Sequence, residues 1–264
     1  MWQIVVLGVM LVVCAIFALA LIINAIVLAV KSIRHSDRRK AGKRTKVTAI
    51  ILTAILVTGA LFVLITQWTA STPVIRDTNG NMAEGSIAEL VQVELNGRKE
   101  WISIRGQSTK NPVLLFLAGG PGGSQMAAVR HDLAGLEEQF VVVNWDQTGS
   151  GKSYGAIPRK DLTTDVYVED GFALTQYLCQ RFGQEKIYLL GESWGSALGI
   201  FMAAQHPDAY HAFIGTGQMV DFVETEIIDY NLALDLAHLA GDHPLVSTLE
   251  SQGPPPYACM VGTR

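Results

Sequence analysis

Ser193 is the residue of this chain whose surroundings best suit covalent chemistry. It is the third residue of the run Gly-Glu-Ser-Trp-Gly at positions 191–195. A serine hydroxyl that projects from a sharp turn between a strand and a helix can attack a carbonyl carbon. Such a turn places the serine at a φ above zero and needs neighbours without bulk, and the glycines at both ends of the run meet that need. The spacing therefore predicts that Ser193 is a nucleophile.

Two loops upstream contain residues that would help such a nucleophile. Residues 118–123 read Ala-Gly-Gly-Pro-Gly-Gly, so their backbone can approach a substrate carbonyl closely, unless they form only a flexible turn. A backbone N–H of this loop and the N–H of Trp194 would then stabilise an oxyanion. Residues 146–153 read Asp-Gln-Thr-Gly-Ser-Gly-Lys-Ser, but Asp146 stands where a phosphate-binding P-loop needs a glycine. We therefore expect no nucleotide site there.

Short apolar runs predict the strands that position these loops, and periodic apolar residues predict the helices between them. Each glycine-containing loop follows a predicted buried strand, as a parallel sheet with crossover helices requires. The expected strands cover residues 112–117, 140–145, 186–190 and 212–219, and the expected helices cover 166–182, 196–205 and 224–239. A hairpin over 88–96 and 101–105, with its turn at Gly97 and Arg98, is expected to open the sheet.

The three motifs, in this order, resemble those of the α/β-hydrolase superfamily and, within it, the proline iminopeptidase-like serine peptidases. The family motifs His-Gly-Gly-Pro-Gly, Asp-Gln-Arg-Gly-x-Gly-x-Ser and Gly-x-Ser-Trp-Gly correspond to residues 118–122, 146–153 and 191–195. The resemblance runs from about residue 86 to the end of the chain. It implies an α/β-hydrolase fold, with a mostly parallel sheet, flanking helices and the start of a helical cap.

The resemblance also implies a reaction and the residues that perform it. A peptide, amide or ester bond would be hydrolysed through an acyl-enzyme on Ser193, with the N–H groups of Gly120 and Trp194 as the oxyanion hole. No cofactor is implied. The sequence departs from the family at Ala118, where His is usual, and at Thr148, where Arg is usual. Neither is the nucleophile, so we expect these departures to alter loop support and hydrogen bonding.

The triad of this superfamily also requires an acid and a histidine, which follow the serine in chain order. Only 71 residues follow Ser193, and they contain one further predicted strand before the cap segment. The downstream histidines, at positions 206, 211, 238 and 243, fall at a helix-to-strand turn or in the cap. We therefore expect this chain to lack the triad acid and histidine and to be inactive alone. The alternative is a non-catalytic, truncated or degenerate hydrolase domain that acts as a membrane-bound binding protein or has no function.

Acidic residues at the start of the cap segment are candidates for substrate binding. Aminopeptidases of the resembled family hold the free amine of the substrate with carboxylates from the cap region. The resemblance therefore implies Glu226, with Glu224 beside it, as the group that pairs with a substrate ammonium. The alternative is that both glutamates lie on the solvent face of a cap helix. The resemblance also implies that the proline-rich segment at residues 253–257 belongs to the cap, unless it is a linker.

Two uncharged apolar runs precede the hydrolase-like region. Residues 2–30 and 47–66 each reach the roughly 20 residues needed to cross a bilayer. A secretory signal peptide would have a basic start and a shorter apolar core, whereas this chain opens with Met-Trp-Gln. We expect a two-span transmembrane hairpin over residues 1–68, a linker over 69–85, an α/β-hydrolase core over 86–221 and the start of a helical cap over 222–264.

Charge predicts how this hairpin is oriented. Residues 31–46 hold eight Lys or Arg and one acid, Asp37, although the whole chain has a net charge of −4. By the positive-inside rule this basic loop lies in the cytoplasm, which places the hydrolase domain outside the cytoplasm. A nucleic-acid-binding patch is the alternative, and the two enclosing spans argue against it. We therefore expect a multi-pass membrane protein with no nucleic-acid partner.

Cysteine content adds little to this organisation. Cys14 falls in the first apolar run, and Cys179 and Cys259 would pair only if the fold brings them together. Three cysteines make no disulfide framework, and no run has the spacing of metal ligands. The sequence leaves the identity of the substrate and the oligomeric state open.

Overall fold

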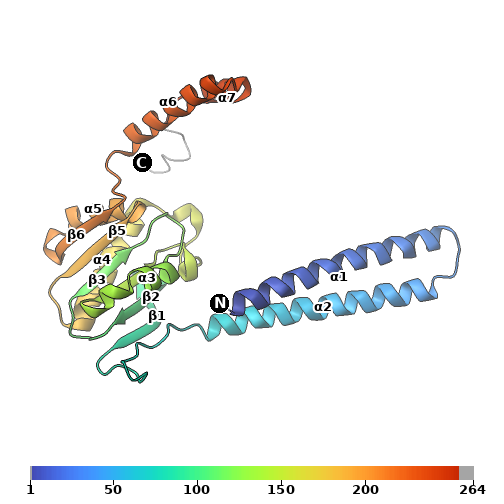
Figure 1. Cartoon of the computed structure of the whole chain (residues 1–264), viewed down its shortest axis with the longest axis horizontal. Coiled ribbons are helices and arrows are strands. Elements are labelled where there is room, and N and C mark those ends of the chain that lie inside the picture. Colours follow the sequence, from blue (N-terminus) through green and yellow to red (C-terminus); the bar gives the residue numbers. More distant parts are fainter. Residues whose placement is uncertain (1, 256–264) are drawn as a thin grey trace. The chain divides into compact units, whose positions relative to one another are not determined.

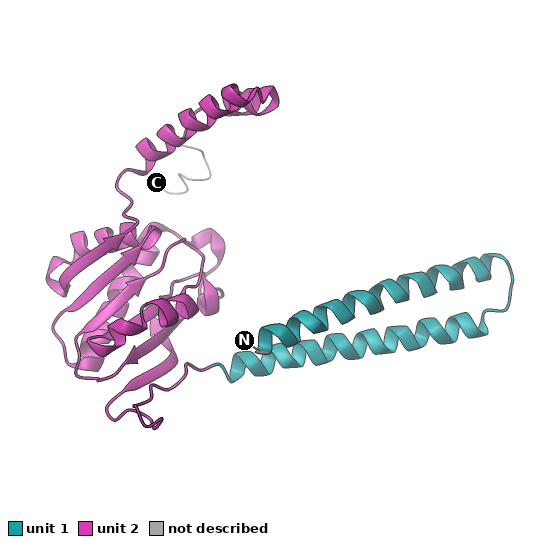
Figure 2. Ribbon diagram, in the orientation of Figure 1, with its two compact units in different colours: residues 1–70 teal, residues 71–264 magenta. Residues whose placement is uncertain are grey.

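A computed structural model describes residues 2–255 of the chain. They belong to two compact units, which comprise residues 1–70 and residues 71–264 (Figure 2). The first unit contains the two long apolar helices. The second contains a six-stranded sheet with helices on its faces and a pair of helices after its last strand.

The first unit is a helical hairpin. Its helices α1 (Trp2–Ile33) and α2 (Arg39–Trp68) pack along each other (Figure 1). Both are long and apolar enough to span a membrane. The side-chain amide of Asn24 donates a hydrogen bond to the hydroxyl of Thr48 over 3.1 Å, which pairs two polar groups between the helices.

The basic segment of this hairpin is more helical than the sequence predicts. A loop was expected over residues 31–46, but α1 continues to Ile33 and α2 begins at Arg39, so residues 34–38 alone lie outside the helices. Lys and Arg have high helix propensity, and both helices therefore extend into the basic segment. Most of its cations consequently project from regular helical turns.

The second unit is organised by a mixed sheet with strand order β1-β2-β4-β3-β5-β6. Strands β4, β3, β5 and β6 are parallel, and β1 and β2 extend the sheet antiparallel at one edge. The strands are β1 (Ile87–Leu95), β2 (Arg98–Gly106), β3 (Val113–Leu117), β4 (Val141–Asp146), β5 (Ile187–Glu192) and β6 (Tyr210–Thr216). The four parallel strands are those predicted from apolar runs, and β6 begins two residues earlier and ends three residues earlier than expected.

The turn of the opening hairpin differs from the prediction by one residue. Leu95 pairs with Arg98, so the two turn residues are Asn96 and Gly97 and not Gly97 and Arg98. Asn96 has φ +49° and Gly97 has φ +78°. Two positive φ angles define the tight turn that best matches the twist of a hairpin, and Asn-Gly is its preferred sequence.

Helices cover both faces of the sheet. Side chains of α4 (Thr164–Phe182) and α5 (Trp194–Gln205) form the larger core cluster with one face, where Trp145, Leu174 and Leu198 are fully buried. Helix α3 (Met126–Asp132) packs on the other face, where its Val129 joins a smaller cluster. Short 3₁₀ helices occupy Ala134–Glu138, Gly151–Ser153, Arg159–Asp161 and Pro207–Ala209.

A helical pair follows β6, and the sequence predicts the first of its two helices, over 224–239, but not the second. Helix α6 (Phe222–Ala240) is capped by the preceding residue, Asp221, whose carboxylate accepts the N–H of Glu224 over 2.8 Å. Helix α7 (His243–Gln252) packs against α6. Of the proline-rich segment, residues 256 and 257 lie outside the described residues, as does Cys259.

Candidate active site

The predicted nucleophile elbow has the backbone geometry that a projecting serine requires. Ser193 lies between β5 and α5 with φ +52° and ψ −119°, a region that non-glycine residues rarely adopt. A Cβ at Gly191 would lie 2.2 Å from the carbonyl oxygen of Gly195, and one at Gly195 would lie 1.9 Å from that of Leu117. The two glycines are therefore required by close backbone packing, as the motif predicts.

The glycine-rich loop begins beside this elbow. Strand β3 pairs in parallel with β5, with Leu117 opposite Gly191, so residues 118–123 and the elbow start at the same edge of the sheet. Gly120 has φ +137°, and a Cβ there would lie 2.9 Å from the N–H nitrogen of Gly122. Trp194 is the first residue of α5, so its N–H has no partner within that helix. Both predicted oxyanion donors thus belong to segments that adjoin at this edge.

Three side chains that the sequence analysis did not single out tie this loop to the elbow. Gln125 accepts the N–H of Gly119 over 2.9 Å and donates to the Glu192 carboxylate over 2.7 Å. Gln147 donates to the carbonyl of Ala118 over 3.0 Å and accepts the indole N–H of Trp194 over 3.1 Å. Glu192 and Gln147 lie within the motifs at residues 191–195 and 146–153, and this position in the sequence is what could have indicated their supporting role.

The loop at residues 146–153 has a structural role in this arrangement. The carboxylate of Asp146 accepts the N–H of Lys152 over 2.6 Å, and a Cβ at Gly151 would lie 2.2 Å from that carboxylate. The hydroxyl of Ser153 accepts the N–H of Trp101 in β2 over 2.8 Å. The glycine and serine of this run therefore fold the loop onto Asp146 and β2.

Thr148 joins a buried network of acids. Its hydroxyl oxygen lies 2.6 Å from the Glu100 carboxylate and 2.7 Å from that of Asp170, and Arg98 forms an ion pair with Asp170. Burial raises the pKa of Glu100 to about 8, and the negative charge of Asp170 acts in the same direction. Burial acts to raise the pKa of Asp170 as well, but hydrogen bonds from Arg98, Thr148 and Asn96 hold it below its ordinary value. Glu100 is therefore the member of the pair that holds a proton.

Glu100→Gln is expected to remove part of the pH dependence of stability. Because folding raises the pKa of Glu100, its stabilising contribution is present below the ordinary pKa of 4.5 and is lost as the pH rises through about 8. Between these values the free energy of unfolding of the unmodified chain should fall relative to Glu100→Gln, by up to about 1.4 kcal/mol per pH unit. Urea unfolding across this pH range measures the difference. The exposed Glu94→Gln is the control, and parallel curves for all three proteins would contradict protonation of Glu100.

An open pocket lies next to the glycine-rich loop. It has a volume of about 510 Å³, and its lining includes Pro121, Gly122, Leu162 and Tyr167. The Tyr167 ring stands edge-on to Trp194, with ring centroids 5.5 Å apart. Its hydroxyl is buried and, among residues 2–255, has no hydrogen-bond partner. The pocket is thus a largely apolar space beside the predicted oxyanion hole.

Histidines and cap acids are not joined to Ser193 within the described residues. The ring of His206 stacks on Phe172 at 3.5 Å between centroids, and His211 lies against Tyr188. His238 lies in α6 and His243 begins α7. Glu224 and Glu226 lie in the first turns of α6. Across residues 2–255, no hydrogen bond links the Ser193 hydroxyl to a histidine, and no ion pair involves either glutamate.

The fold and the elbow define the class of protein. Residues 112–242 match the family described as alpha/beta hydrolase fold, and together with the relatives below this match makes the chain an α/β-hydrolase-type protein. Within it, the chain is proline iminopeptidase-like. It is 40% identical over 146 residues to the probable aminopeptidase YbaC of Bacillus subtilis, covering 55% of this chain and 46% of that protein. It is 31% identical over 120 residues to the proline iminopeptidase of Lactobacillus helveticus, covering 45% and 40%.

A solved structure is also similar to this chain. The proline iminopeptidase-related protein of Thermus thermophilus has a TM-score of 0.48 and 27% identity, over 56% of this chain and 50% of that one. This chain spans less than half the length of the two curated relatives named above.

Proposed function

We propose that this chain carries the nucleophile of a membrane-anchored serine hydrolase. The Ser193 oxygen would bond to the carbonyl carbon of a peptide, amide or ester, and the leaving group would depart with a proton. Water would then release the acyl group and restore the hydroxyl. The N–H groups of Gly120 and Trp194 would hold the oxyanion. The observation that carries this proposal is the positive φ of Ser193 at a turn enclosed by two glycines that allow no side chain.

The reaction also needs a general base. A serine hydroxyl without one is a weak nucleophile, and residues 2–255 bring no histidine into hydrogen-bond contact with Ser193. We therefore propose that the chain does not turn over substrate by itself and becomes active when a triad acid and histidine complete the sheet. A non-catalytic binding protein is the competing function, and it predicts that completing the sheet restores no turnover.

We propose a small substrate with a free amine. The names of the relatives indicate aminopeptidase chemistry, and the pocket beside residues 118–123 offers an apolar space for the acyl side chain. A substrate ammonium needs a carboxylate partner when it leaves water. Glu226, with Glu224 beside it, is our candidate for that partner, because α6 is expected to belong to the cap.

The substrate proposal is tested in a chimera in which the carboxyl-terminal half of the Bacillus subtilis relative follows the cap segment. Glu226→Gln should lower kcat/KM for an aminoacyl amide by about tenfold to a hundredfold, because a charge-assisted hydrogen bond is lost. The N-acylated form of the same amide should lose much less. Glu250→Gln in α7 is the matched control and should affect neither substrate. Equal losses on both would leave a general amidase or esterase, and a chimera without any turnover would favour the binding protein.

We propose that the hairpin anchors the enzyme and sets its orientation. The transmembrane hairpin would comprise residues 1–68, the linker 69–85, the hydrolase core 86–221 and the cap 222–264, with the basic residues between 31 and 46 in the cytoplasm. Two apolar helices and a strong positive charge between them support this topology.

A reporter fused after Thr72 is expected to show activity only if it works outside the cytoplasm. The charge bias sets this orientation, so replacing the eight basic residues between positions 31 and 46 with Gln should give mixed orientation. Paired reporters, one active outside and one active inside the cytoplasm, measure the proportions. Full activity of the cytoplasmic reporter after Thr72 would contradict the two-span topology.

A further inference from the structure

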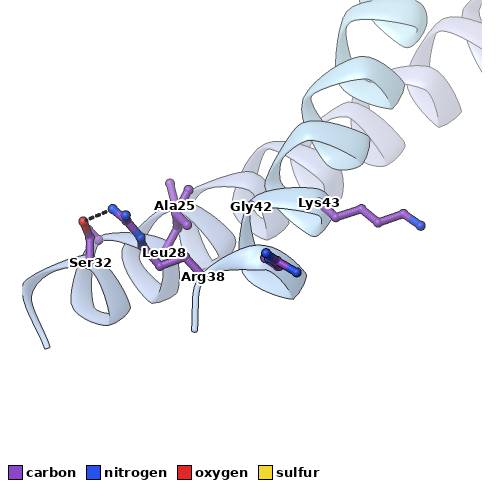
Figure 3. A pocket seen from close by; sticks show the side chains of 8 residues that line it. Ala25, Leu28, Ser32, Arg38, Gly42 and Lys43 are labelled. Carbon is purple, nitrogen blue, oxygen red and sulfur yellow. Dashed lines mark hydrogen bonds between the residues drawn. The ribbon is translucent and has the colours of Figure 1, made fainter. Parts of the chain in front are cut away.

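The turn of the helical hairpin contains an open pocket of about 620 Å³ (Figure 3). One wall comes from the end of α1 and the other from the start of α2. Ser32 and Arg38 lie on opposite sides of the turn, and the Arg38 guanidinium donates to the Ser32 hydroxyl over 2.9 Å. This contact holds a cationic group against the pocket.

Three cations line this pocket, and among residues 2–255 none of them has a partner acid. Arg38, Arg39 and Lys43 surround the start of α2, where the helix dipole adds positive potential. Asp37 is the sole acid of the basic segment, and its carboxylate accepts the N–H of Arg39 over 3.0 Å. Within residues 2–255 none of the three cations forms an ion pair. This pocket is therefore suited to an anion.

The rest of the pocket is apolar. Ala25, Leu28 and Ala29 of α1 form one wall, and Gly42 of α2 faces Leu28. A Cβ at Gly42 would lie 3.9 Å from the Leu28 side chain, so the absence of a side chain leaves space between the helices. This wall continues into the exposed apolar surface of α1, where Ile22 and Ile26 are more than half exposed. A ligand that fits must be anionic at one end and hydrocarbon at the other.

We propose that this pocket binds an anionic phospholipid, with its phosphate against Arg38, Arg39 and Lys43 and an acyl chain along Ala25 and Leu28. A free phosphate ion would offer the same negative charge to these cations, but only a lipid would also contact the apolar wall. Lys and Arg beside a membrane span attract anionic lipids as a diffuse charge, and the pocket adds a defined site. The inference goes beyond the proposed hydrolase activity and rests on the proposed membrane anchor.

The test compares two triple variants of the full chain in detergent, titrated with phosphatidylglycerol. Arg38→Gln, Arg39→Gln and Lys43→Gln remove the pocket cations, whereas Lys31→Gln, Arg34→Gln and Lys46→Gln remove the same charge outside the pocket. Removal of the pocket cations should weaken the apparent affinity for phosphatidylglycerol about tenfold or more. Removal of the same charge outside the pocket should weaken it about threefold or less. Equal losses would mean diffuse attraction and would overturn the site.

A third variant and two further ligands separate the lipid from other sources. Gly42→Leu keeps every cation and fills the apolar space, so it should weaken phosphatidylglycerol binding about fivefold or more. Unchanged binding, or equal binding of inorganic phosphate or phosphatidylcholine, would overturn the proposal. Resistance of each variant to alkaline carbonate extraction from membranes is scored separately. If alkaline carbonate extracted the unmodified chain from membranes, the proposed membrane anchor would be contradicted. The titration in detergent would still test the lipid site independently.

Discussion

Ser193→Ala is expected to lower kcat of the chimera by about 10⁴-fold or more on both aminoacyl and N-acylated amides. The substitution removes the only atom proposed to bond to the carbonyl carbon, while the oxyanion donors remain. Steady-state turnover, together with the stoichiometry of a covalent serine-directed phosphonate, measures the loss. Both should vanish together, because the same oxygen forms the acyl-enzyme and the phosphonate adduct.

Ser86→Ala provides the matched control for this loss. Ser86 precedes β1 and donates to the carbonyl of Ala83, far along the chain from the elbow. Its replacement should leave turnover within about twofold of the unmodified chimera, as surface substitutions usually do. If Ser193→Ala kept more than a tenth of the activity, another residue would have to be the nucleophile.

Gly195→Ala is expected to destabilise the hydrolase unit by about 3 kcal/mol or more, a large share of the stability of an ordinary domain. The added Cβ would lie 1.9 Å from the carbonyl oxygen of Leu117, and backbone atoms of a central strand cannot rotate away as a side chain can. Either β3 and α5 separate or the elbow changes shape. Thermal unfolding of the detergent-solubilised chain, followed by tryptophan fluorescence, reports the change through Trp145 and Trp194.

Gly135→Ala is the corresponding control. A Cβ at Gly135 meets no atom within 4 Å, so this variant should unfold within about 1 kcal/mol of the unmodified chain. A Gly195→Ala protein as stable as Gly135→Ala would show that β3 and α5 do not approach as closely as described. The loss of stability would then not explain the glycine of the motif.

Much of this architecture follows from local residue patterns. The runs that form β3, β4 and β5 are short and mostly apolar because these strands are covered on both faces, and that pattern is readable without any partner. The elbow is equally local, since five consecutive residues contain both the serine and the glycines that allow its φ. The predicted position of the hairpin turn is one residue too late, because Asn96 also adopts a positive φ, which short polar side chains tolerate.

Residue types alone determined the strand-to-helix elbow at Ser193, the parallel core and the two apolar helices, because each depends on neighbours within a few positions of the chain. The tertiary structure alone decided which side chains support the site. Gln125 reaches Glu192 across 67 positions, and Thr148 reaches Glu100 across 48, through strand pairings that no local pattern encodes. The proton on Glu100 has the same origin, since burial and a neighbouring acid raise a pKa only after the sheet has brought both carboxylates together.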